Sequence, residues 1–148
     1  MSALSILQAT RTIAVVGLSP RPERASFRIS KYMQAQGYRI IPIHPAATEV
    51  LGEKAYPTLT AAAQAVPIDL VNCFRRSEDI PPIAHEAVAI GAKALWLQLG
   101  IENDEACAHA SRHGLDTVQN LCLKVEHAHW LRTGKLSVKY GTPATIRA

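Results

Sequence analysis

A glycine at the end of an apolar run is the first feature of this sequence that suits a ligand. The run begins at Thr12 and ends at Gly17, and Ser19 and Ser26 follow it with hydroxyl groups. Free backbone N–H groups and the helix dipole hold a phosphate at the start of a helix, and a glycine lets the backbone approach it closely. The segment therefore predicts a site for a phosphate-bearing ligand, against the alternative of an ordinary strand-to-helix turn.

Basic residues gather on the same segment. Positions 21–31 carry four of them and a single acid, Glu23. Arg24 and Arg28 are four residues apart, which puts them on one face of a helix. Local positive charge favours an anionic ligand, although a solvated helix face gives the same pattern. The net charge of the whole chain, +4, does not by itself indicate a nucleic acid partner.

The turn after the first strand lacks the signature of a dinucleotide site. That signature is G-x-G-x-x-G with an acidic residue at the end of the second strand. Residues 17–22 read Gly-Leu-Ser-Pro-Arg-Pro, with one glycine, and the second strand ends at Ile43, His44 and Pro45, with no acid. A Walker-type phosphate loop is also absent from the sequence. These observations disfavour NAD and ATP.

The histidines and cysteines predict neither a metal site nor a catalytic residue. The 3 cysteines fit no zinc motif by their spacing. His127 and His129 are two residues apart, so on a helix their side chains do not converge on one ion. The other candidates, His85, His109 and His113, fall on predicted helices and are expected at the surface.

Short apolar runs alternate with helical stretches along the chain. This order predicts an α/β fold, a Rossmann-like doubly wound and mostly parallel sheet of five to six strands with helices on both faces. The predicted strands are residues 12–17, 38–43, 69–74, 94–99 and 116–121. Residues 1–132 are predicted to form one ligand-binding domain, and residues 133–148 a tail that is loose or docked on the surface.

Ligands of doubly wound sheets bind outside the carboxyl ends of the strands, where the strand order reverses. That rule selects four segments of this chain, residues 17–19, 43–45, 74–76 and 98–100. The first of them is the glycine turn, so the fold and the turn chemistry predict the same location.

Several motifs resemble the stand-alone CoA-binding proteins of bacteria and archaea, which are similar to the N-terminal domain of the succinyl-CoA synthetase α subunit. The resemblance covers residues 12 to about 130. In chain order the motifs are Val-Gly-Leu-Ser (16–19), Ala-Ser-Phe-Arg (25–28), Gly-Tyr-Arg-Ile-Ile-Pro (37–42), Asp-Leu-Val-Asn-Cys-Phe-Arg (69–75), Gly-Ala-Lys (91–93) and Trp-Leu-Gln-Leu-Gly (96–100).

The resemblance implies a Rossmann-like fold with coenzyme A, or an acyl-CoA, as the cofactor. It implies that Gly17, Ser19, Arg24 and Ser26 contact the phosphates and that Ile43, His44 and Pro45 line the next wall of the site. It also implies that Phe74 and Arg75 flank the adenosine and that Gln98 lies near the pantetheine.

Two positions depart from the family pattern. His44-Pro45 stands where the family often has Asn-Pro, and Cys122-Leu123 stands where it often has Cys-Pro. Cys122 falls at the carboxyl end of a predicted strand, on the ligand side, and we include it among the candidate cofactor-binding residues. A thiolate there could exchange with CoA disulfide, and a buried, inert role is the alternative.

These features favour a non-catalytic module that binds CoA or an acyl-CoA, as a sensor, a carrier or a partner subunit. The alternatives are a small component of an acyl-CoA ligase or NAD(P)-linked enzyme, and an interaction protein without a ligand. We expect a small-molecule cofactor, with a protein partner or a second copy as further options, and neither nucleic acid nor membrane. The sequence has neither a signal peptide nor an apolar run near the ~18 residues that span a bilayer, so we expect a cytoplasmic protein.

Overall fold

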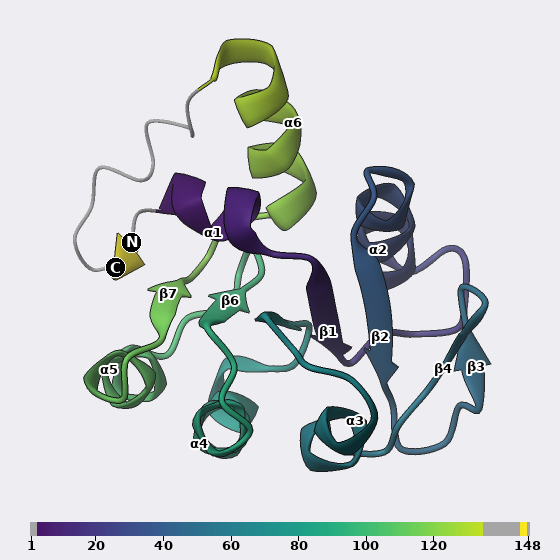
Figure 1. Ribbon diagram of the computed structural model, residues 1–148, viewed down its shortest axis with the longest axis horizontal. Coiled ribbons are helices and arrows are strands. Elements are labelled where there is room, and N and C mark those ends of the chain that lie inside the picture. The colour runs from purple at the N-terminus through teal and green to yellow at the C-terminus, as the bar shows by residue number, and fades with distance from the viewer. Residues whose placement is uncertain (1–2, 135–145, 148) are drawn as a thin grey trace.

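The computed structural model of the protein describes residues 3–134 and 146–147, and its centre is a parallel sheet (Figure 1). The spatial order of the strands is β2-β1-β5-β6-β7, with a sixth strand, β8, antiparallel to β7. Their bounds are β1 Thr12–Val16, β2 Arg39–Ile43, β5 Leu70–Cys73, β6 Ala94–Leu97, β7 Asp116–Val118 and β8 Ile146–Arg147. The predicted Rossmann-like α/β fold with a mostly parallel sheet is confirmed.

Helices cover both faces of this sheet (Figure 1). One face packs against α1 (Ala3–Ala9), α2 (Ala25–Ala35) and α6 (Leu123–Thr133). The other packs against α3 (Leu59–Ala65), α4 (Ile80–Ala89) and α5 (Asp104–Arg112). A 3-10 turn, η1 (Ser77–Asp79), precedes α4, and a small hairpin of β3 (Glu49–Val50) and β4 (Glu53–Lys54) follows β2. None of the helices within residues 3–134 is long and apolar enough to cross a bilayer.

The central strands are apolar on both sides because each side faces a separate core. In β6, Leu95 and Leu97 point to the layer of α3, α4 and α5, whereas Ala94 and Trp96 point to the opposite layer. Trp96 has no exposed surface, and its indole Nε1–H donates to the Leu121 carbonyl at 2.8 Å. Two-sided burial explains why these strands read as unbroken apolar runs.

Two segments add to what the sequence predicts. α1 carries neither an acidic first turn nor a basic last turn, and it was not predicted; Ile6 and Leu7 anchor it in the core. The tail predicted for residues 133–148 begins inside α6, and residues 135–145 and 148 lie outside the described part. The described pair Ile146–Arg147 forms β8, so the strand at residues 116–118 is not the last one.

The order in which the chain adds strands to the sheet reverses beside β1. From β1 the chain moves to β2 on one side, then crosses back through α3 to β5 on the other side, and β6 and β7 continue outward from there. Loops that leave the carboxyl ends of β1 and β5 therefore turn to opposite faces of the sheet and leave a crevice between them.

Candidate functional site

Two joined cavities open at the carboxyl edge of the sheet. The first has a volume of about 550 Å³ and the second about 470 Å³, and each is of the size of small-molecule sites, ~300–1,000 Å³. Phe74, Arg75 and Arg76 line both cavities. The remaining walls of the first are Val16, Gly17, Ser19, Ile43, His44, Pro45, Pro57 and Asp79, and those of the second are Ala25, Ile29, Gln98, Leu99, Ile101 and Cys122.

At Gly17 the first turn packs closely against the loop after β5. Its φ of +87° lies in the left-handed region that glycine alone enters without strain. A Cβ at this position would lie 2.7 Å from the carbonyl oxygen of Phe74. The glycine predicted for close approach to a phosphate is thus already required by close approach to the protein's own backbone.

Ser19 and Ser26 hold the same turn together. The Ser19 N–H donates to Ser26 Oγ at 3.0 Å, and the Arg21 N–H donates to Ser19 Oγ at 3.1 Å. Ser19 lines the first cavity, whereas Ser26 is buried and lines neither cavity. The predicted contact of Ser26 with phosphate stays a prediction, and the structure gives this residue a role in shaping the turn.

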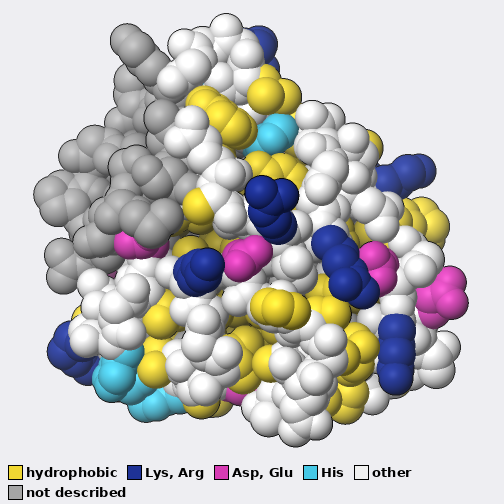
Figure 2. Space-filling view, in the orientation of Figure 1, with side chains coloured by type: hydrophobic (Ala, Val, Ile, Leu, Met, Phe, Trp, Pro, Cys, Tyr) yellow, Lys and Arg dark blue, Asp and Glu magenta, His cyan; other side chains and the backbone are white. Residues whose placement is uncertain are grey.

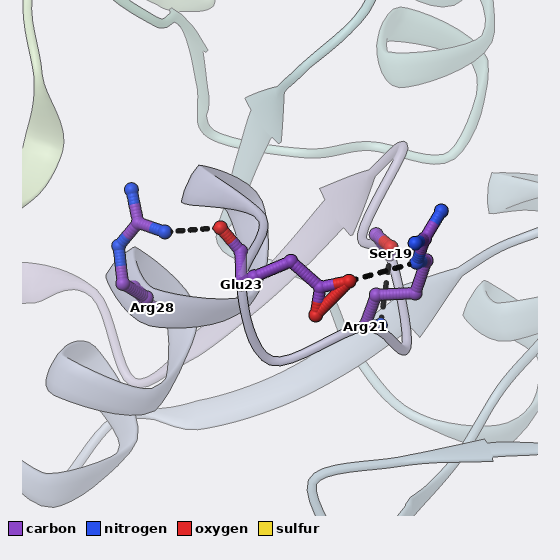
Figure 3. Close-up of polar contacts among 4 residues, drawn as sticks. All are labelled: Ser19, Arg21, Glu23 and Arg28. Carbon is purple, nitrogen blue, oxygen red and sulfur yellow. Dashed lines mark hydrogen bonds and ion pairs between the residues drawn. The ribbon is translucent and has the colours of Figure 1, made fainter.

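The basic residues at the start of α2 line neither cavity. Arg21 Nε pairs with Glu23 Oε1 at 2.9 Å, and the Arg28 guanidinium donates to the backbone carbonyl of Glu23, on the other side of that residue (Figure 3). Arg24 is the N-cap of α2 with an exposed side chain, and it lines neither cavity. The structure therefore does not bring Arg24 to the predicted phosphate site.

Two other arginines bring positive charge to the cavities. Asp79 Oδ2 lies 3.7 Å from Arg75 Nη2 and 3.2 Å from Arg76 Nε, so one carboxylate serves two guanidinium groups. The hydrogen bond and charge of Asp79, with the charge of Glu78, raise the pKa of Arg76. Among the residues that line the cavities, the two guanidinium groups face one carboxylate, and this excess of positive charge at the junction suits an anionic ligand.

His44 forms part of the wall after β2. Its Nδ1 accepts the Ala46 N–H at 3.0 Å and the Ala47 N–H at 2.9 Å. Asn and Asp side chains hold turns by the same kind of bond, so His44 fixes the turn after β2. With Nδ1 as the acceptor, the neutral ring carries its proton on Nε2 and is a donor there. Ile43 and Pro45 line the cavity on either side.

Gln98 and Cys122 shape the second cavity. Gln98 is 3% exposed, and its Oε1 accepts the Leu123 N–H at 3.0 Å, which fixes the first turn of α6. Cys122 is the N-cap of that helix and is partly exposed. Cys73 and Cys107 are buried, and burial raises the pKa of the Cys73 thiol.

The predicted surface histidines lie close to one another and line neither cavity. The ring centroids of His85 and His109 are 3.7 Å apart, and those of His109 and His113 are 4.5 Å apart. Figure 2 shows histidine side chains together at one corner of the molecule, over α4 and α5. Within residues 3–134, no group of three or more histidines, cysteines or acids is placed to hold a metal ion.

The predicted site residues converge with two exceptions, Arg24 and Ser26. The strand-end rule selected residues 74–76 and 98–100, which include Arg76 and Leu99, but sequence reasoning named neither of them as a binding residue. An Arg-Arg pair directly after a buried strand was the available signal for Arg76. Within residues 98–100, no further signal distinguished Leu99.

Comparisons with known proteins agree with this geometry. The model of the CoA binding domain matches residues 11–128. The uncharacterized protein YneT of Bacillus subtilis (strain 168) is 46% identical over 123 residues, which is 83% of this chain and 90% of YneT. A hypothetical protein from Pyrococcus horikoshii OT3 shares the fold with a TM-score of 0.82 and 35% identity, covering 86% of this chain and 88% of that chain.

A larger structure contains a similar unit. The apo form of the dinucleotide forming acetyl-coenzyme A synthetase 1 of Ca. Korarchaeum cryptofilum matches with a TM-score of 0.64 and 21% identity, over 74% of this chain and 26% of that chain. At this identity the likeness concerns the fold. The family match and the identity to YneT show more: as its motifs predicted, this chain belongs to the CoA binding domain family.

Proposed function

We propose that this protein binds coenzyme A or an acyl-CoA across the two joined cavities, as a non-catalytic module that serves as a sensor, a carrier or a partner subunit. The observation that carries the proposal is the position of Arg75 and Arg76. They lie where the more polar cavity meets the more apolar one, and both pair with the Asp79 carboxylate. CoA has a matching build, with an anionic nucleotide at one end and a less polar pantetheine arm at the other.

The polarity of the walls supports one orientation of the ligand. The first cavity offers the Ser19 turn, the His44 Nε2–H donor and the two arginines to phosphate oxygens. Phe74, at the junction, offers a ring to the adenosine or the pantetheine arm. The amide nitrogen of Gln98 has no partner among the described residues, so it is available to an amide oxygen of pantetheine.

Titratable groups around the first cavity already bond to other protein groups, which favours a binding role over a catalytic one. His44 Nδ1 already accepts two backbone N–H groups, and the Asp79 carboxylate is held between two arginines. A general base needs a free lone pair within reach of a substrate proton. We therefore assign these groups to shaping the site and binding the ligand.

Calorimetric titration with CoA, ADP, NAD and ATP tests the proposal. We expect CoA to bind more tightly than NAD and ATP, and mass spectrometry of small molecules released from the purified protein to detect CoA or an acyl-CoA. Arg76→Gln removes a charge-assisted contact and should weaken CoA binding by about tenfold or more, since such bonds contribute ~1.5–3 kcal/mol. Arg21→Gln is the matched control, because Arg21 pairs with Glu23 outside both cavities. A folded protein that gives no heat with CoA would refute the proposal.

A further inference from the structure

We infer that the second cavity receives an uncharged, apolar acyl chain, so that the preferred ligands are acyl-CoA thioesters of short monocarboxylic acids and not those of dicarboxylic acids. This inference rests on the proposed function, because it assumes that the nucleotide end of CoA occupies the first cavity. It adds the chemical class of the group carried on the thiol.

The walls of the second cavity change character away from the junction. Its charged lining residues, Arg75 and Arg76, are the two that it shares with the first cavity. Beyond them the described lining is aliphatic or neutral: Ala25, Ile29, Leu99, Ile101, Gln98 and Cys122. A ligand that enters from the junction therefore moves from two cations toward an apolar wall.

Leu99 gives this wall an unusual exposed surface. It is 60% exposed, one of three large hydrophobic side chains that are largely exposed in the described chain, and it lies directly after Gln98. Val125 and Leu131, the other two, line neither cavity. With Ile29 and Ile101, Leu99 makes the lining of the second cavity mostly apolar, and cavities of this kind bury the apolar parts of small ligands.

The wall around Leu99 can bury an apolar acyl group, but its described residues offer no cation to an anionic one. A terminal carboxylate beside Leu99 and Ile101 would lose water without gaining a cation, because the nearest charges in the lining are the arginines at the junction, where the nucleotide phosphates bind. A methylene there gains by leaving water. Chain length should therefore tighten binding, and a terminal carboxylate should weaken it.

The test compares the dissociation constants of CoA, acetyl-CoA, butyryl-CoA and succinyl-CoA by calorimetry. Each methylene buried against the wall should tighten binding by about fourfold, so butyryl-CoA should bind roughly tenfold or more tightly than acetyl-CoA. Succinyl-CoA has a chain of similar length to butyryl-CoA but ends in a carboxylate, and it should bind about tenfold or more weakly than butyryl-CoA.

Leu99→Lys locates the acyl chain, because it places a cation on the wall at an exposed position that tolerates it. The ratio of succinyl-CoA affinity to butyryl-CoA affinity should rise by about tenfold in this variant. Val125→Lys is the matched control, because Val125 is a similarly exposed apolar residue outside both cavities, and it should leave the ratio as in the wild type.

The outcomes separate this inference from the proposed function. CoA binding with no dependence on the acyl group, or tighter binding of succinyl-CoA by the wild type, overturns the inference and leaves CoA binding intact. An equal ratio in Leu99→Lys and Val125→Lys also overturns it, because the acyl chain then lies elsewhere. Failure of every CoA species to bind overturns both.

Discussion

Gly17→Ala should destabilise this protein more than an alanine at other left-handed glycines. Two costs add at this position. An alanine at a φ of +87° is strained by ~1–2 kcal/mol, and its Cβ would lie 2.7 Å from the Phe74 carbonyl oxygen, well inside ordinary contact. Relief of such a clash by a backbone shift costs a further ~1–3 kcal/mol. The total loss of unfolding free energy is therefore about 2–5 kcal/mol.

Gly114→Ala separates the two costs. Gly114 has a φ of +91°, nearly that of Gly17, and no atom lies within 4 Å of the position its Cβ would take. This control should lose only the backbone term, ~1–2 kcal/mol. Urea denaturation without ligand measures both variants. Equal losses would refute the argument that contact with Phe74, and not φ alone, demands a glycine at position 17.

Two further predictions concern buried polar groups. Burial lowers the pKa of His127, whose ring lies edge-on to Tyr32 and accepts or donates a hydrogen bond to its hydroxyl at 3.1 Å. The unfolded chain thus binds a proton at His127 more readily than the folded chain, so the unfolding free energy should fall as the pH drops below about 6.5. Denaturation at pH 5 and pH 7.5 should show a smaller fall in His127→Gln than in the wild type. Equal falls in the two proteins would contradict the assignment to His127. Gln98→Leu leaves the Leu123 N–H without an acceptor and should lower the unfolding free energy by ~1–3 kcal/mol, measured by urea denaturation. The exposed control Gln64→Leu should lower it by ~0.5 kcal/mol or less. Similar losses in the two variants would argue against the hydrogen bond.

The fold was largely predictable because its signals are local. Strands buried on both faces read as apolar runs, and a glycine follows each of the helices α2, α4 and α5 within two residues of its end. Asn103 caps α5 through a bond from the Ala106 N–H, as its residue type favours. α1 escaped prediction because its seven residues carry no such signal and are held by tertiary packing of Ile6 and Leu7.

The segments that form the site could be predicted from the sequence, but the side chains that line it could be predicted less well. The rule for parallel sheets selects strand ends, and residues from all four selected ends line the cavities. Which residue of a segment faces the ligand depends on the turn that follows. Ser26 turns inward to Ser19, and Arg28 turns back to Glu23, so the basic helix face that the sequence displays does not reach the cavities (Figure 3).

The segment around Cys122 has a consequence for the rates of ligand exchange. Strand β6 and the residue after it bond to both sides of Cys122: Trp96 of β6 donates to the Leu121 carbonyl, and Gln98 accepts the Leu123 N–H. The opposite wall holds Arg75 and Arg76, which are 48% and 75% exposed and pair only with Asp79 among the described residues. One wall is thus fixed by the sheet, and the other consists of long side chains that reorient in nanoseconds or less. We expect a ligand to enter and leave past the arginines, so that changes at this wall alter the dissociation rate, whereas the Cys122 segment keeps its place whether the site is empty or filled.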